Sequence, residues 1–170
     1  ALALGFEQMT PGALGSVFDD RPNPGEKFFM ELASFQDFSK PGPPAAMLFG
    51  SAGIEYMNKY GTKPETFAKI TVKARKHAKP NERAVFRDLL TVEQVMESPL
   101  QFGPLTRFQC CPPTCGAAAA ILCSDEFAKK HNISDSVYIA AQSMKTDTDS
   151  TFTDKSAMKI VGYDMAKAAA

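Results

Sequence analysis

The sequence predicts an α/β protein. Short runs of apolar and small residues that suit strands occupy residues 1–6, 105–109, 117–122 and 137–141. The segments between them carry apolar residues at helical spacing, with helix start and stop signals at their ends. The chain has 170 residues, of which 44% are hydrophobic and 22% charged, so it suits one globular domain and not a disordered segment.

Composition argues against several classes of protein. The 19 Lys and Arg side chains balance the 19 Asp and Glu side chains, so no nucleic acid partner is predicted. No apolar run approaches the ~20 residues that cross a bilayer, so no transmembrane segment is predicted. Cys110 and Cys111 are neighbours that cannot bridge each other without severe strain, which favours reduced, partly buried thiols over disulfides. His77 and His131 are isolated and no Cys-x-x-Cys pair occurs, so no metal site is predicted.

Residues 1–6 are predicted to form a buried core strand that continues through residues 7–9. Residues 10–44 are predicted to be loop-like because prolines and glycines interrupt them. Several large apolar side chains inside this segment are predicted to pack as a satellite core under the loop: Phe28, Phe29, Met30, Leu32, Phe35 and Phe38.

Two helices are predicted next. Residues 45–60 show a helical pattern, and Gly61 stands where a C-terminal cap is expected. Thr62 and Glu65 form a predicted capping box for a second helix, with Pro64 in its first turn. An apolar stripe is predicted along that helix through Phe67, Ile70, Ala74 and His77 or Ala78. Its other face is basic and is interpreted either as a solvated surface or as a contact for the phosphates of a ligand: Lys69, Lys73, Arg75, Lys76 and Lys79.

The second half of the chain repeats these signals. Thr91 and Gln94 form another capping box and predict a short helix that stops at Ser98 and Pro99. Residues 117–122 are ambiguous: alanine favours a helix, whereas their length and the helix start at Ser124 favour a buried strand. The remaining elements are a strand at 105–109, a helix that ends near Asn132 with Phe127 and Ala128 facing inward, a strand at 137–141, and helix or loop and helix over 154–170.

Residues 109–120 read QCCPPTCGAAAA, an improbable cluster of adjacent cysteines, prolines and small residues. This segment resembles the signature of the sterol carrier protein X type of thiolase. Further segments resemble that family in the same order, so that the resemblance covers nearly the whole chain: ALGFEQM at residues 3–9, YGT at 60–62, FRD and LTVEQVM within 86–96, and VGYDM at 161–165.

The resemblance implies part of a thiolase fold, which has two similar α/β halves and a loop domain inserted in the first half. It implies that residues 1–9 end the N-terminal half, 10–104 form the loop domain, 105–131 return to the N-terminal half, and 132–170 start the C-terminal half. It also implies a homodimer or larger assembly and a peroxisomal location, with the mitochondrion or the cytoplasm as alternatives.

Thiolases of this type cleave 3-ketoacyl-CoA with free CoA, through a cysteine that takes the acyl group and a histidine that activates it. In the family, the nucleophile motif precedes the segment that this chain resembles, and the Gly-His-Pro motif follows it. No residue of the chain is therefore expected to be catalytic, and the 170 residues alone are predicted to be inactive. Cys110, Cys111, Cys115 and Cys123 do not align with the catalytic cysteines.

The resemblance places Phe108, Gln109, Cys110 and Cys111 along the channel for the pantetheine arm of CoA, with CoA as a substrate and no tightly bound cofactor. The alternative for the two cysteines is small-residue packing in the core. Relatives usually carry Asp before the glycine, where this chain has Cys115, which predicts the loss of a hydrogen bond that fixes the loop. The predicted function is acyl transfer to CoA as part of a 3-ketoacyl-CoA thiolase. The alternative is a non-catalytic thiolase-like subunit that binds acyl-CoA or a partner.

Overall fold

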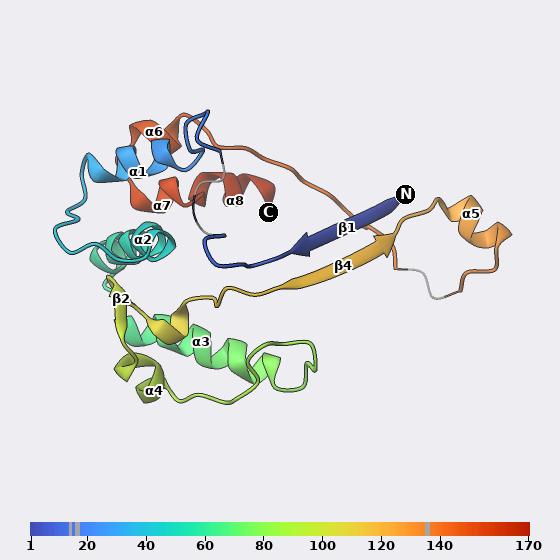
Figure 1. The fold of residues 1–170 in the computed structure, drawn as a ribbon, viewed down its shortest axis with the longest axis horizontal. Coiled ribbons are helices and arrows are strands. Elements are labelled where there is room, and N and C mark those ends of the chain that lie inside the picture. The colour runs from blue at the N-terminus through green and yellow to red at the C-terminus, as the bar shows by residue number, and fades with distance from the viewer. Residues whose placement is uncertain (14, 16–17, 135–136) are drawn as a thin grey trace. The chain divides into compact units, whose positions relative to one another are not determined.

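A computed structural model describes residues 1–13, 15, 18–134 and 137–170 (Figure 1). Residues 14, 16 and 17 of the predicted loop lie outside the described residues. The chain divides into two compact units. Unit 1 consists of Ala1–Asn23 and Pro112–Met144, and unit 2 consists of Pro24–Cys111 and Lys145–Ala170. Each unit is a mixture of helix and strand, in agreement with the predicted α/β class.

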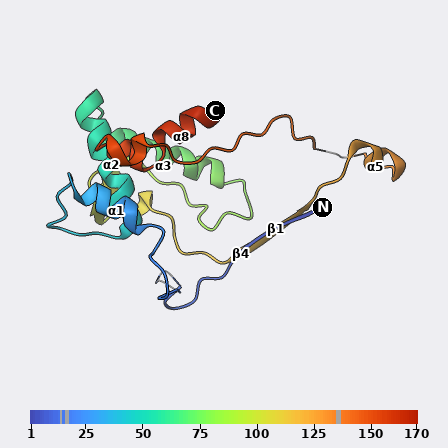
Figure 2. The same cartoon turned by 90° about the horizontal axis from the view of Figure 1, so that it is seen from above.

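Unit 1 is built on an antiparallel ribbon of β1 (Leu2–Glu7) and β4 (Gly116–Ile121), which run side by side in Figure 1 and Figure 2. The register pairs Leu2 with Ile121 and Glu7 with Gly116. The predicted strand at the N-terminus is therefore confirmed, and the ambiguous segment at 117–122 proves to be a strand. The alanine run forms a strand against its helix propensity because β1 supplies the ladder of hydrogen bonds that a strand requires.

The prediction that these strands are buried is wrong. Every residue of β1 and β4 is exposed, with Phe6 at 77% and Ile121 at 83% of their full accessible surface. A two-stranded ribbon has no second layer to cover either of its faces, and such a ribbon alone is at best marginally stable in water. The apolar composition of these strands fits a larger sheet than unit 1 contains.

Among its described residues, the rest of unit 1 carries one helix. Ser124 caps α5 (Asp125–Lys130), as predicted, by accepting a hydrogen bond from the backbone N–H of Phe127 at 3.2 Å. Ala128 is buried, but Phe127 is half exposed and stacks on His131, which corrects the inward orientation predicted for it. The described residues 137–141 form no strand, contrary to prediction, because no neighbouring strand pairs with them.

Unit 2 is mainly helical (Figure 1). Its elements are α1 (Glu26–Ala33), α2 (Pro44–Tyr60), α3 (Pro64–Ala78), α4 (Val92–Glu97), β2 (Leu100–Phe102), β3 (Leu105–Thr106), the 3-10 turn η1 (Arg107–Gln109), α6 (Ser150–Thr153), α7 (Ala157–Ile160) and α8 (Tyr163–Ala169). The buried core combines Leu32 of α1 with Ala157 and Ile160 of α7, and α2 packs against α7.

Helix α1 lies inside the segment predicted to be a loop, so that prediction is wrong for residues 26–33. The sequence holds no proline between Pro24 and Pro41, and Glu26 places a negative charge in the first turn, where the helix dipole favours it. Phe28, Phe35 and Phe38 pack against the buried cluster of Leu32, Ala157 and Ile160. These aromatic residues therefore belong to the main core of unit 2 and not to a satellite core.

Helix α2 confirms the predicted helix and its end. Gly61 adopts φ 66°, and its N–H donates to the carbonyl of Met57 at 2.8 Å. Inside the helix, Gly50 lets the β2–β3 hairpin approach closely, because an added Cβ would lie 2.7 Å from the carbonyl oxygen of Phe102. This contact seats the hairpin on α2.

We expect Gly50→Ala to lower the free energy of unfolding. Alanine gains about 1 kcal/mol in helix propensity, but the clash with a backbone oxygen forces α2 and the hairpin apart. The net loss should be about 1–3 kcal/mol in a urea denaturation experiment. Asn58→Ala, on an exposed position of the same helix, is the control and should change stability by less than about 0.5 kcal/mol. Equal stability of Gly50→Ala and the parent protein would contradict the close approach.

Helix α3 differs from prediction at its start and in its inward face. Its N-cap is Lys63, which makes no side-chain capping hydrogen bond, so the capping box predicted for Thr62 is wrong. Ala68 is its buried residue, whereas Ile70 is 61% exposed, which also corrects the predicted stripe. The helix packs against α4 and η1, and this contact selects the face that carries Ala68.

Two reciprocal caps organise the segment after α3. At α4, as predicted, the N–H of Gln94 donates to Thr91 Oγ1 at 3.2 Å and the N–H of Thr91 donates to Gln94 Oε1 at 2.9 Å. The strand predicted at residues 105–109 is shorter, because only Leu105–Thr106 is extended and a second cap turns the chain into η1.

No helix of the described residues has the length and apolar character needed to cross a membrane.

Candidate functional site

The turn that carries the predicted CoA-contacting residues is anchored on α4. Thr106 is buried, and its Oγ1 donates a hydrogen bond to the carbonyl of Val95 at 2.6 Å. Its backbone N–H donates to Gln109 Oε1 at 2.8 Å, and the N–H of Arg107 donates to the carbonyl of Pro99 at 2.8 Å. These bonds fix the position of η1 and therefore of the residues that follow it.

The structure brings three of the four predicted residues to one exposed turn. Phe108 is 40% exposed, and Cys110 and Cys111 are exposed free thiols. Gln109 is half-buried, and its side-chain oxygen caps η1. Gln109 therefore shapes the turn, and Phe108, Cys110 and Cys111 remain available for contact with a ligand. All four cysteines are exposed as residues, which corrects the prediction of partly buried thiols except at Cys110, whose sulfur is partly buried.

The thiol of Cys110 is poorly suited to act as a nucleophile. Although the residue as a whole is exposed, partial burial of its sulfur raises the pKa of the thiol, and the neighbouring Cys111 raises this pKa further. Its Sγ lies 3.7 Å from the carbonyl oxygen of Thr106, a distance that suits a weak S–H donor. The reactive form of cysteine is the thiolate, so a raised pKa lowers reactivity at neutral pH.

We expect carboxamidomethylation of Cys110 by iodoacetamide to require more alkaline pH in the folded protein than in urea. The folded pKa is raised, so at any pH below it the folded chain holds less thiolate than the unfolded chain. Mass spectrometry of the peptide containing Cys110, across a pH series, measures both profiles. Identical pH profiles in the folded and unfolded protein would contradict the desolvation of this sulfur.

In unit 1, Cys115 fixes the loop before β4 through its sulfur. Its Sγ accepts a hydrogen bond from the backbone N–H of Met9 at 3.3 Å and lies 3.7 Å from the carbonyl oxygen of Met9. Thr114 Oγ1 donates to the carbonyl of Pro112 at 3.0 Å. The cysteine sulfur therefore makes a hydrogen bond of its own across this loop.

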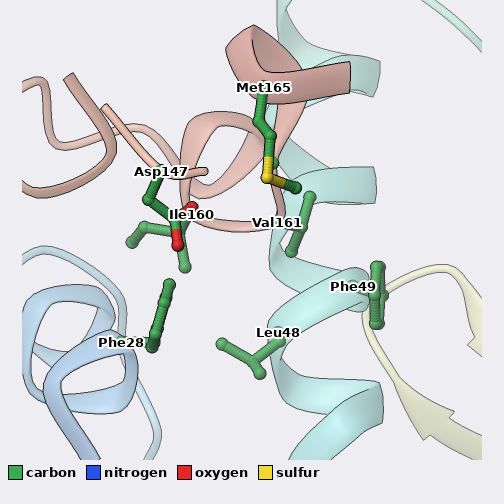
Figure 3. Close-up of a pocket in the computed structure, with 8 residues that line it drawn as sticks. Phe28, Leu48, Phe49, Asp147, Ile160, Val161 and Met165 are labelled. Carbon is green, nitrogen blue, oxygen red and sulfur yellow. The ribbon is translucent and has the colours of Figure 1, made fainter. Parts of the chain in front are cut away.

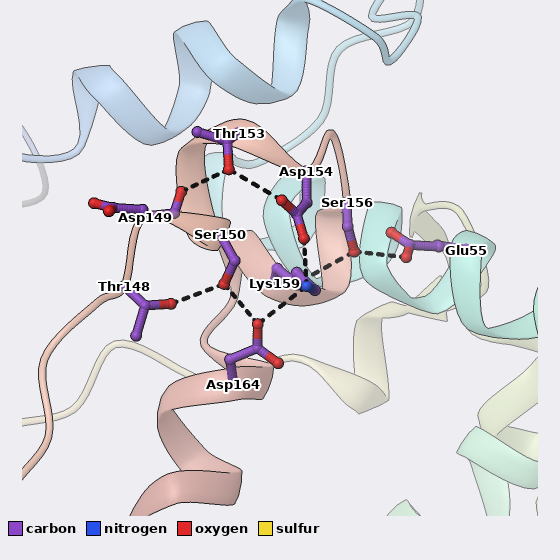
Figure 4. Close-up of polar contacts among 9 residues, drawn as sticks. All are labelled: Glu55, Thr148, Asp149, Ser150, Thr153, Asp154, Ser156, Lys159 and Asp164. Carbon is purple, nitrogen blue, oxygen red and sulfur yellow. Dashed lines mark hydrogen bonds and ion pairs between the residues drawn. The ribbon is translucent and has the colours of Figure 1, made fainter.

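A polar cluster in unit 2 joins α2 to α7 (Figure 4). Glu55 of α2 accepts hydrogen bonds from Ser156 Oγ at 2.6 Å and from the N–H of Met158 at 3.1 Å, so it caps the start of α7. Lys159 pairs with Asp154 at 2.5 Å and with Asp164 at 3.2 Å. Each of these side chains has a partner, so we interpret the cluster as structural.

Ion pairs and hydrogen bonds within this cluster shift the pKa values of Asp154, Lys159 and Asp164. The hydrogen bond from Lys159 lowers the pKa of Asp154, and the hydrogen bonds from Ser150 and then Lys159 lower the pKa of Asp164. The two carboxylates in turn raise the pKa of Lys159. Because the carboxyl pKa values are lowered, their contribution to stability is present above the unfolded pKa and is lost as the pH falls through the folded pKa.

A cavity of about 290 Å³ lies in unit 2 among α1, α2, α7 and α8 (Figure 3). Its apolar lining consists of Phe28, Leu48, Phe49, Ile160, Val161 and Met165. Asp147 is the one ionisable lining residue, and Gly162, with φ 93°, completes the lining. Sequence reasoning missed this cavity because its lining residues are distant along the chain.

The basic face of α3 carries lysines without acidic partners. Within the described part of the chain, no ion pair involves Lys69, Lys73 or Lys76, and all three are exposed. Arg75 differs, since its guanidinium lies 4.7 Å from the centre of the Phe86 ring. The lysines can therefore attract an anion.

In the described residues, no group of three or more metal-ligating side chains is present.

Comparison with known proteins gives this α/β chain its class. No model of a known family matches it. It is 50% identical to sterol carrier protein 2 of Rattus norvegicus over 170 residues, 99% of this chain and 31% of that protein. It is 33% identical to non-specific lipid-transfer protein-like 2 of Caenorhabditis elegans, over 96% of this chain and 41% of that protein. The benzoylsuccinyl-CoA thiolase subunit BbsB of Thauera aromatica is 37% identical over 54% of this chain and 24% of that protein.

These similarities confirm the resemblance to thiolases of the sterol carrier protein X type. The chain is related to thiolases over part of its length. Over nearly its whole length, it is related in particular to proteins named sterol carrier protein 2. It spans about a third of the length of these relatives.

Proposed function

We propose that this chain is the central part of a 3-ketoacyl-CoA thiolase and that it shapes the channel for acyl-CoA. The observation that carries this proposal is the similarity to sterol carrier protein 2 along 99% of the chain, together with similarity to a CoA thiolase. The exposed, anchored turn at Phe108, Cys110 and Cys111 supports it. In the reaction, 3-ketoacyl-CoA and CoA give a shortened acyl-CoA and acetyl-CoA.

The turn and the basic helix have complementary roles in this proposal. Phe108, Cys110 and Cys111 line the channel for the pantetheine arm, and Gln109 holds the turn in shape. Helix α3 packs against η1, so its lysines lie on an element next to the turn. There they favour the phosphates of CoA through charge attraction. CoA is a substrate, and we propose no tightly bound cofactor.

The catalytic groups belong to other parts of the protein in this proposal. The raised pKa of Cys110 supports a binding role for this residue instead of nucleophilic attack. Under the thiolase assignment, residues 1–9 and 105–131 belong to the N-terminal half, 10–104 to the loop domain and 132–170 to the C-terminal half. The exposed β1–β4 ribbon then pairs with further strands of that fold.

Assembly and location are part of the same proposal. The exposed apolar side chains of β1 and β4 support a homodimer or larger assembly, in which this surface is covered. Light scattering of the full-length protein tests the assembly, and a monomer would contradict it. We place the protein in the peroxisome, which cell fractionation tests against the mitochondrion and the cytoplasm.

A second candidate function is lipid or acyl-CoA binding without turnover. The name of the Caenorhabditis elegans relative, a lipid-transfer protein, favours it. Assay of the natural full-length protein with 3-ketoacyl-CoA and CoA separates the two candidates. Release of acetyl-CoA supports the thiolase. Saturable binding of acyl-CoA without cleavage supports the binding subunit and overturns the thiolase proposal.

A further inference from the structure

We propose that the C-terminal end of α3, together with the segment that follows it, binds the surface of an anionic lipid bilayer. The surface, which we call the 75–89 patch, combines four cations with three exposed apolar side chains: Arg75, Lys79, Arg83, Val85, Phe86, Arg87 and Leu89. All of these residues belong to unit 2. The inference goes beyond the proposed function, because its ligand is a lipid surface and not the acyl-CoA substrate.

Positive charge is concentrated in this part of a neutral chain. The whole sequence has 19 basic and 19 acidic side chains, but residues 63–88 hold eight Lys and Arg against three Asp and Glu. Glu82 and Asp88 are the acidic residues between positions 75 and 89. Within the described residues, none of the four cations of the patch forms an ion pair. Their charge is therefore available to attract the headgroups of anionic lipids.

Exposed apolar side chains accompany these cations. Val85 is 59%, Phe86 47% and Leu89 51% exposed. Apolar side chains of this kind enter the boundary between headgroups and acyl chains, while Lys and Arg keep their charged ends among the headgroups. A surface for single-stranded nucleic acid uses aromatic rings on which bases stack, whereas two of these three side chains are aliphatic. The mixture therefore favours a lipid surface over a nucleic acid.

The fold holds the segment against the end of α3 before any lipid is present. The guanidinium of Arg75 lies 4.7 Å from the centre of the Phe86 ring, which is a cation–π contact. Arg87 Nε donates a hydrogen bond to the carbonyl of Lys79 at 3.0 Å. Figure 1 shows the chain turning back after α3 toward α4. Helix and segment thus present their cations and apolar side chains together.

The 75–89 patch does not include the lysines that we assign to the phosphates of CoA. Those lysines are Lys69, Lys73 and Lys76, on the exposed face of α3. A lipid headgroup and CoA offer the same phosphate chemistry to a cation, so a test of the patch must separate the two ligands. Free CoA in excess is the competitor that does so, and we expect it to leave binding to the lipid surface unchanged.

Cosedimentation of the natural full-length protein with lipid vesicles tests the patch. We expect binding to vesicles of phosphatidylcholine mixed with phosphatidylserine, and not to phosphatidylcholine alone, and we expect added salt to weaken it. The double substitution Lys79→Gln and Arg83→Gln should weaken binding on the order of tenfold or more. Val85→Trp should strengthen it, because tryptophan favours the membrane interface. The matched control, Lys40→Gln with Lys130→Gln, removes two exposed cations from other segments and should leave binding unchanged.

The variants separate a lipid-binding patch from general damage. Weaker binding of Lys79→Gln with Arg83→Gln and stronger binding of Val85→Trp support the proposal, because misfolding cannot produce both. Absence of vesicle binding by the parent protein, or equal weakening in the control variant, would overturn it. Displacement by CoA, or preferential binding of a single-stranded oligonucleotide, would overturn it in favour of that ligand. Thiolysis without vesicle binding would overturn the patch and leave the proposed function intact.

Discussion

Leu32→Ala should destabilise unit 2 by about 2–5 kcal/mol, the range for removing a large buried side chain from a core. Leu32 is 0% exposed and lies in the cluster with Ala157 and Ile160. Truncation removes its contacts with this cluster and leaves a cavity between α1 and α7 that the surrounding aromatic residues cannot fill completely. Because α1 contributes few other buried residues, we expect it to detach first.

Hydrogen exchange of the full-length protein, followed by mass spectrometry, measures this effect for each segment. Exchange should accelerate most at residues 26–33 and 157–160. Leu89→Ala, at a position that is 51% exposed, removes the same atoms and should change exchange little. Unchanged protection of α1 and α7 in Leu32→Ala would contradict the core assignment.

Cys111→Trp should lower the thiolysis rate of the full-length protein by about 100-fold, as expected when a substrate is displaced from its reactive position. Cys111 is an exposed residue that follows the C-cap of η1, and the turn is held by the hydrogen bonds of Thr106 and Gln109. An indole at this position occupies the proposed pantetheine channel, and the fixed turn cannot move aside. Cys111→Ser replaces the sulfur with a smaller oxygen, which leaves the channel open, and should retain most of the activity.

A Trp substitution at a second cysteine tests whether the loss of activity depends on where the indole is placed. Cys123 is also exposed and free, but it lies in unit 1, after strand β4. Cys123→Trp should leave kcat and KM near the parent values. Full activity of Cys111→Trp would contradict the channel assignment. A large loss of activity in Cys111→Ser would also contradict it, since that result requires a chemical role for the thiol.

The sequence predicted the local elements that depend on nearby residues. The helix of residues 44–60, its glycine cap at Gly61 and the reciprocal cap of Thr91 and Gln94 all follow from signals within a few positions. The alanine-rich segment at 117–122 is ambiguous in the sequence, since propensity favours a helix and context favours a strand, and the structure has a strand at Gly116–Ile121. These features require no knowledge of distant segments.

The predictions that failed depend on contacts between distant segments. Burial of β1 was inferred from its composition, but exposure depends on which segments cover a sheet, and β4 is its sole strand partner among the described residues. The sequence pattern predicts Ile70 on the buried face of α3. Packing of this helix on α4 and η1 buries Ala68 instead and leaves Ile70 exposed. Helix α1 departs from the predicted loop because the segment between Pro24 and Pro41 contains no proline to break a helix.

The candidate site follows the same division between local signals and contacts between distant segments. The resemblance to a family signature predicts that Phe108–Cys111 contact CoA, whereas the turn that carries them and the capping role of Gln109 appear only in the structure. The cavity and the Glu55 cluster could not be predicted, since Glu55 lies 101 residues from Ser156. No local pattern links such positions.

A crystal structure of the full-length protein with bound CoA tests the central claim most directly. The account predicts that the pantetheine arm passes within about 4 Å of Phe108 and Cys111, the distance of van der Waals contact. It also predicts that the phosphates face the lysines of α3. CoA bound with its pantetheine arm remote from this turn, or bound only to segments outside these 170 residues, would contradict the account.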